Sequence, residues 1–88
     1  MTEKSIKDMA LDFVRYFIEQ ICEHKDKVEV TGEDDEQGCV ISVIVDDSDM
    51  GRLIGKDGQT ISALRTLLRT IGSRGQAKIK LKVLEPEA

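Results

Sequence analysis

The segment 53–60, Leu-Ile-Gly-Lys-Asp-Gly-Gln-Thr, constrains the fold most, because two glycines three positions apart lie between short apolar runs. Glycine adopts positive φ at little cost, so Gly55 and Gly58 predict a sharp turn. The residues after Gly58 predict the first turn of a helix, where unpaired N–H groups carry partial positive charge. With Lys56 at its tip, the segment has the ingredients of a phosphate-binding loop.

Charge is divided unevenly along the 88 residues, whose formal net charge is −4. Residues 1–50 carry 5 Lys/Arg against 14 Asp/Glu, whereas residues 51–82 carry eight basic residues against Asp57 alone. The basic half surrounds the glycine pair, which predicts a polyanionic partner for one face of the protein. Lys78, Lys80 and Lys82 have two readings: they bind that partner, or they form the solvated face of an amphipathic strand.

The length and the cysteines predict one small cytoplasmic domain over residues 1–88, with a short acidic tail at 85–88. No apolar run reaches the roughly 18 residues that a membrane span needs. The N-terminus lacks the basic and apolar regions of a secretory signal. Cys22 and Cys39 have no spacing typical of a disulfide framework, so we expect reduced, packed thiols.

Hydrophobic periodicity predicts the secondary structure. Apolar residues recur every three or four positions in a helix over 5–23, with Ser5 as its N-cap and Phe13 and Phe17 in the core. Tyr16 is expected at the rim of that core. A short strand around Val28 and an acidic turn over 32–38 precede a continuous β-branched strand over 39–45.

The second half of the chain predicts two more helices and a third strand. The acidic run 46–49 suits the N-cap and first turn of a short helix over 50–54. The helix after the glycine loop carries an apolar stripe and ends at Gly72. Apolar residues alternate with lysines over 77–83, which indicates an amphipathic strand.

This element order, α-β-β-α-α-β, predicts an α+β fold. The short turn pairs the first two strands as a hairpin, and the two helices before the last strand allow a right-handed parallel crossover. The result is a three-stranded mixed sheet with three helices on one face.

The segment 50–60 resembles the Ile-Gly-x-x-Gly signature of the KH domain. The element order resembles the type II KH topology, and the whole chain is similar to the small bacterial single-KH proteins of the KhpA family. The resemblance implies a protein that clamps about four nucleotides of single-stranded RNA. It also implies a post-transcriptional regulator or RNA chaperone that acts as a homodimer or with a larger KH-containing protein.

Carried over by motif position, the resemblance assigns roles to individual residues. Gly55 and Gly58 allow close approach of the backbone, and Lys56 neutralises phosphate. Ile54 floors the groove, and Arg52 contacts a phosphate or a base. The predicted RNA-binding set is Arg52, Leu53, Ile54, Gly55, Lys56, Asp57, Gly58, Gln59 and Arg65.

Two parts of this assignment have alternatives. Arg65 and Arg69 lie four apart on one helix face, where they extend the binding track or are ordinary solvated charges. Asp57 places a carboxylate at the tip that faces phosphate, which weakens binding unless the side chain points outward or accepts local N–H groups.

Other functions fit the residues less well. A Walker A loop needs four residues between its glycines, and Gly51 to Gly55 leaves three. Cys22, His24 and Cys39 lack the paired spacing of metal ligands, and we expect neither a cofactor nor catalysis. A lone histidine after a helix is expected to help the last carbonyls or to face solvent. The alternative to RNA binding is a protein–protein adaptor with a KH fold.

Overall fold

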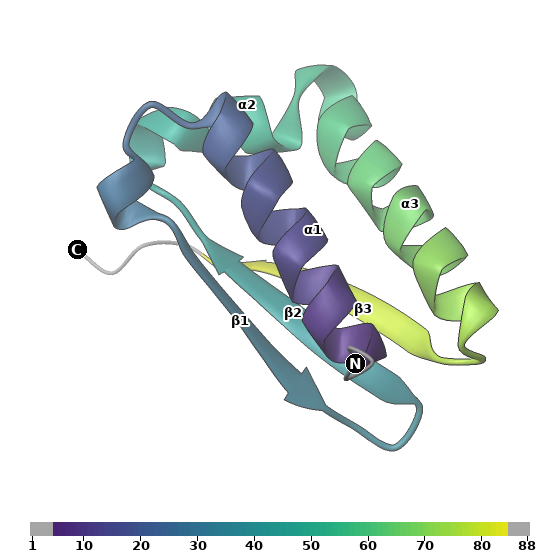
Figure 1. Cartoon of the computed structure of the whole chain (residues 1–88). Helices are drawn as coiled ribbons and strands as arrows, with labels where there is room; N and C mark the ends of the chain where they lie inside the picture. Colours follow the sequence, from purple (N-terminus) through teal and green to yellow (C-terminus); the bar gives the residue numbers. More distant parts are fainter. Residues whose placement is uncertain (1–4, 85–88) are drawn as a thin grey trace.

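The computed structural model describes residues 5–84 and shows the expected α+β element order (Figure 1). The predicted acidic tail lies outside the described residues. Of the helices in the described part of the chain, none combines the length and apolarity needed to cross a membrane. The elements are α1 (Ile6–Ile21), β1 (Glu29–Asp34), β2 (Gly38–Ile44), α2 (Met50–Ile54), α3 (Gln59–Arg74) and β3 (Lys78–Leu84), with 3₁₀ turns at Lys25–Lys27, Asp47–Asp49 and Lys56–Gly58.

The sheet is mixed and has the strand order β1-β2-β3. β1 and β2 pair antiparallel, with Val30 opposite Val43, whereas β2 and β3 pair parallel, with Ile41 opposite Leu81. The parallel pair is closed by the crossover through α2 and α3. The predicted three-stranded mixed sheet is therefore confirmed.

The helices form one layer over a single face of the sheet (Figure 1). α1 lies over β1 and β2, and α3 lies beside α1 over β3. Alternate residues of β2 are buried against this layer, as expected for a central strand with one covered face. The buried apolar core comprises Ala10, Val14, Ile18, Cys22, Val30, Cys39, Ile41, Val43, Val45, Leu53, Ile61, Leu64, Leu68 and Leu81.

α1 begins as predicted, because the Ser5 hydroxyl accepts a hydrogen bond from the Asp8 N–H at 3.1 Å. Its innermost line is Ala10, Val14 and Ile18, and the two phenylalanines predicted in the core are half-buried beside it. Tyr16 is 68% exposed, so its predicted place at the rim of the core is wrong.

The hairpin turn is shorter than predicted, because β1 continues through Gly32 to Asp34. The turn itself is made by Asp35, whose Oδ1 accepts hydrogen bonds from the N–H groups of Gln37 and Gly38 at 2.9 and 2.7 Å. Asp35 also pairs with Lys80 at 3.3 Å. Asp35 therefore organises the turn of the hairpin.

The prediction that α3 ends at Gly72 is wrong, since the helix continues to Arg74. Gly72 is buried, and a Cβ there would collide with the carbonyl oxygen of Ala77 at the start of the return to β3. The reversal after the helix is made by Gln76, whose φ is 56°. Gly72 is needed for close packing of α3 on this return segment.

Candidate nucleic-acid interface

The two loop glycines are required for different reasons. Gly55 has φ 77°, and a Cβ there would overlap the side chain of Thr60, so the loop folds tightly onto the start of α3. Gly58 has φ 75°, yet a Cβ there would meet no atom within 4 Å. The first glycine therefore serves packing and conformation, whereas the second serves conformation and leaves an open surface.

Asp57 also adopts the left-handed conformation, with φ 56° and ψ 26°. Aspartate tolerates this region better than most residues with a Cβ. Asp57 and Gly58 form two successive left-handed residues that turn the chain directly into α3. The left-handed backbone therefore explains an aspartate at position 57 whether or not its carboxylate contributes to binding.

The N-terminus of α3 has no side-chain cap, although the Gln59 N–H donates to the Lys56 carbonyl oxygen of the preceding 3₁₀ turn. Gly58 occupies the N-cap position, so no side chain caps the helix there. The first N–H groups of a helix lack partners within the helix and carry partial positive charge. Lys56 and Gln59 are exposed on either side of this turn. The result is an exposed, positively polarised backbone surface with a lysine beside it.

The apolar residues in and directly after the motif divide between core and surface. Leu53 is fully buried and supports the loop from inside, so it does not reach a ligand. Ile61 is buried as well, whereas Ile54 is exposed next to the loop. Of these three residues, only Ile54 presents apolar surface for a ligand to contact.

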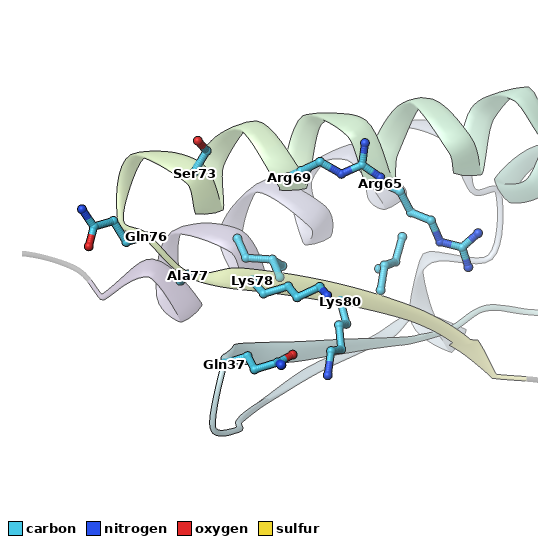
Figure 2. Close-up of a pocket in the computed structure, with 10 residues that line it drawn as sticks. Gln37, Arg65, Arg69, Ser73, Gln76, Ala77, Lys78 and Lys80 are labelled. Atoms are coloured by element: carbon cyan, nitrogen blue, oxygen red, sulfur yellow. The ribbon is translucent and has the colours of Figure 1, made fainter.

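A basic groove of about 640 Å³ runs between α3 and β3. Figure 2 shows Arg65 and Arg69 coming from α3 and Lys78 and Lys80 from β3. Lys82 does not line this groove, although it belongs to the same strand. Four basic residues that were expected either to bind a ligand or to be solvated thus line one groove: Arg65, Arg69, Lys78 and Lys80.

Gly51 is a further candidate for contact with a ligand, and it is absent from the predicted RNA-binding set. It is the second residue of α2 and is exposed, and a Cβ there would meet nothing within 4 Å. A glycine in a helix costs up to about 1 kcal/mol relative to alanine. Neither a positive φ nor close packing explains a glycine at this position. The sequence indicated the site only by placing a glycine inside a predicted helix.

Asp49 anchors the helix that leads to the loop. Its carboxylate is 1% exposed and accepts hydrogen bonds from the backbone N–H groups of Glu23 and His24, at 3.1 and 3.0 Å. The hydrogen bond from His24 N–H, more than any other influence, holds the pKa of Asp49 below its ordinary value. The acidic run 46–49 was predicted to cap the short helix, but within it only Asp46 caps, at the preceding 3₁₀ turn.

His24 and Arg52 complete the contacts of Asp49. The His24 ring Nδ1 lies 3.3 Å from Asp49 Oδ2 and 3.1 Å from Ser48 Oγ. Of the two places expected for this side chain, the solvent-facing one applies in part, because 46% of it is exposed. Arg52 donates to Asp49 Oδ1 at 3.3 Å and to Glu23 Oε1 at 2.7 Å. The arginine predicted to contact RNA is therefore held by two carboxylates.

Comparison with known proteins decides the family. The model of the KhpA/KhpB KH domain matches residues 11–83, which include β1, β2, the glycine loop and all of β3 except its last residue. The chain belongs to the KhpA/KhpB KH-domain family. The predicted KH fold and the resemblance to the KhpA family are both confirmed.

Curated members of this family cover almost the same length. RNA-binding protein KhpA of Aquifex aeolicus is 38% identical over 74 residues, which is 84% of this chain and 94% of the relative. The proteins of the same name from Chlamydia caviae and Listeria monocytogenes are 32% and 31% identical over 74 residues, which cover 84% of this chain and 95% and 97% of the relatives.

A solved structure shares the fold. In a crystal structure of Aquifex aeolicus Era bound to GDP.AlF4-, the match covers 96% of this chain and 32% of that one, with a TM-score of 0.59 and 19% identity. At this identity the likeness is one of fold alone.

Proposed function

We propose that this protein binds single-stranded RNA by placing the sugar-phosphate backbone against the glycine loop. The main observation behind the proposal is the N-terminus of α3, which no side chain caps and which lies beside the exposed Lys56. Phosphate is favoured at such a site by the N–H donors and by the helix dipole. The family relatives named as RNA-binding proteins support the same ligand.

The basic groove extends the proposed site beyond the loop. Arg65 lies seven residues after Gly58, about 10 Å along the helix at 1.5 Å per residue, and Arg69 lies one turn further. A strand that leaves the loop along α3 meets Arg65 and Arg69 on one side and Lys78 on the other. Exposed Ile54 and the bare backbone at Gly51 offer contact on the other side of the loop.

The proposal includes a second RNA-binding module. One KH domain clamps about four nucleotides, so its affinity and sequence preference are limited. Linking two modules raises the effective concentration of the second contact. We therefore propose that the protein acts in the cytoplasm as a homodimer or with a larger KH-containing protein, as a post-transcriptional regulator or RNA chaperone.

The test of the loop is fluorescence anisotropy with a labelled single-stranded RNA pool at two salt concentrations. The proposal predicts that wild-type binding weakens with salt and that Lys56→Asp loses most of it. Lys27→Asp makes the same charge change at an exposed lysine outside the loop and the groove, and it should bind nearly as wild type. Equal binding by wild type and Lys56→Asp would contradict the loop assignment.

An adaptor function is the second candidate, because a second groove is apolar. It has a volume of about 290 Å³ between α1 and α3 and is lined in part by Phe17, Ala63 and Leu67. Leu67 is 48% exposed there. A protein partner held by this groove would bind with little salt dependence and would be lost in Leu67→Gln, whereas RNA binding would survive that change.

A further inference from the structure

The guanidinium of Arg52 is already occupied in the free protein. Nη2 donates to Glu23 Oε1 at 2.7 Å, and Nη1 donates to Asp49 Oδ1 at 3.3 Å. The Arg52 side chain is nevertheless 48% exposed. It lies in the last turn of α2, three residues before Gly55.

The two carboxylates differ in what else they hold. Asp49 is buried and accepts two backbone N–H groups as well as the contact with the His24 ring, so it is part of the fold. The Glu23 side chain is 67% exposed, and Arg52 is its one partner in the part of the chain that the structure describes. Glu23 can therefore leave Arg52 without exposing any other buried group.

The backbone determines where the Glu23 carboxylate lies. Because Asp49 accepts the N–H of Glu23 at 3.1 Å, the start of this side chain is fixed beside the turn that leads into α2. From there it forms the shorter of the two contacts with Arg52. The short distance is typical of a charge-assisted hydrogen bond to a guanidinium.

A phosphate and the Glu23 carboxylate bind the same kind of donor on Arg52. Both are anions that bind the planar N–H donors of a guanidinium, preferably through two of them. A phosphate that binds the Nη2 donor now held by Glu23 must displace that carboxylate, and it experiences repulsion from it while it approaches. An exposed ion pair contributes little to folding, about 0.2–1 kcal/mol, so its replacement leaves the fold intact.

We propose that Glu23 competes with RNA phosphate for Arg52 and so lowers the affinity of the free protein for RNA. The inference rests on the proposed RNA binding at the glycine loop. It makes Glu23 an affinity-setting residue that does not itself touch RNA, and it makes Arg52 a cation that becomes available when a phosphate displaces the carboxylate.

The decisive variant is Glu23→Gln, measured by RNA anisotropy at low salt. Removing the competing charge should tighten binding roughly two- to fivefold, the equivalent of one exposed ion pair. Glu19→Gln removes the same charge one turn earlier in α1 and controls for net charge. In the Arg52→Gln background, Glu23→Gln should have no effect, because the two residues act as a pair. Thermal unfolding of each variant verifies the fold, and Glu23→Ala provides a second way to release Arg52.

The outcomes separate this inference from the proposed function. If Glu23→Gln binds as wild type or more weakly while Lys56→Asp still loses binding, the competition is wrong and the loop assignment stands. An equal gain in Glu19→Gln would reduce the effect to net charge and would also overturn the competition. If Lys56→Asp binds as wild type, the proposed function itself is wrong.

Discussion

The carboxylate of Asp49 accepts a hydrogen bond from the backbone N–H of His24 at 3.0 Å, across 25 positions of sequence. Together with the bond from Glu23 N–H, it joins the end of α1 to the turn that begins α2. These bonds favour the charged carboxylate and lower the pKa of Asp49 in the folded protein. The position of the loop-bearing helix therefore depends on one ionised, buried side chain.

The first prediction concerns acid stability. Because the pKa of Asp49 is lower in the folded protein than its ordinary unfolded value of about 3.9, the unfolded chain binds its proton first. The stabilisation is complete at neutral pH and is lost as the pH falls below about 5 and then through the folded pKa. Unfolding midpoints from pH 7 to pH 3 should show this loss in wild type and a smaller one in Asp49→Asn. Asp47→Asn, at an exposed carboxylate, should retain the wild-type pH dependence.

We predict that Gly51 makes the protein less stable than alanine at this position would. Gly51→Ala should raise the free energy of unfolding by up to about 1 kcal/mol, because alanine is the better helix former and its Cβ meets open space. The same variant should bind RNA more weakly if a ligand approaches the backbone there. Chemical denaturation and anisotropy on one protein preparation measure both effects. Unchanged RNA affinity would remove Gly51 from the interface.

Asp57 is predicted to serve the conformation of the loop and to oppose its binding. Asp57→Asn keeps a residue that tolerates the left-handed region and removes one negative charge, so RNA affinity should rise with stability nearly unchanged. Asp57→Val should destabilise the protein by about 1–2 kcal/mol, because a β-branched residue is poorly accommodated at positive φ. A fall in affinity in Asp57→Asn would show that the carboxylate contributes to binding.

The groove predicts a particular salt dependence. Removing one cation that binds a phosphate should reduce the slope of log K against log salt by about 0.7 for a single strand. Arg69→Gln and Lys78→Gln, on opposite sides of the groove, should each show this reduction. Lys82→Gln alters the same strand outside the groove and should leave the slope as in wild type. Slopes that stay as in wild type for all three variants would place the RNA elsewhere.

Local features could be predicted from the sequence because their causes are local. The turn at Gly55 and Gly58, the Ser5 cap and the short helix before the loop follow from backbone preferences and neighbours in sequence. The strand order followed from connection lengths, and the inward alternation of β2 suits its central position.

Features with distant causes could not be predicted. In the sequence Gly72 resembles a residue that ends a helix. In the structure a glycine is required there because the Ala77 carbonyl oxygen approaches it closely after the helix has ended. In the sequence Asp49 resembles a helix cap. Its actual partners, the N–H groups of Glu23 and His24, lie 26 and 25 positions earlier and cannot be identified from its neighbours. The hairpin turn was predicted too long because acidic residues favour turns, whereas pairing with β2 extends β1 through Asp34.

RNA binding at the glycine loop is tested most directly by an NMR titration of the ¹⁵N-labelled protein with a short single-stranded RNA. We expect the largest amide shifts on residues 51–59 and along the exposed side of α3 near Arg65 and Arg69. Shifts confined to the apolar groove around Leu67, or to the acidic hairpin, with residues 55–58 unchanged, would contradict binding at the loop.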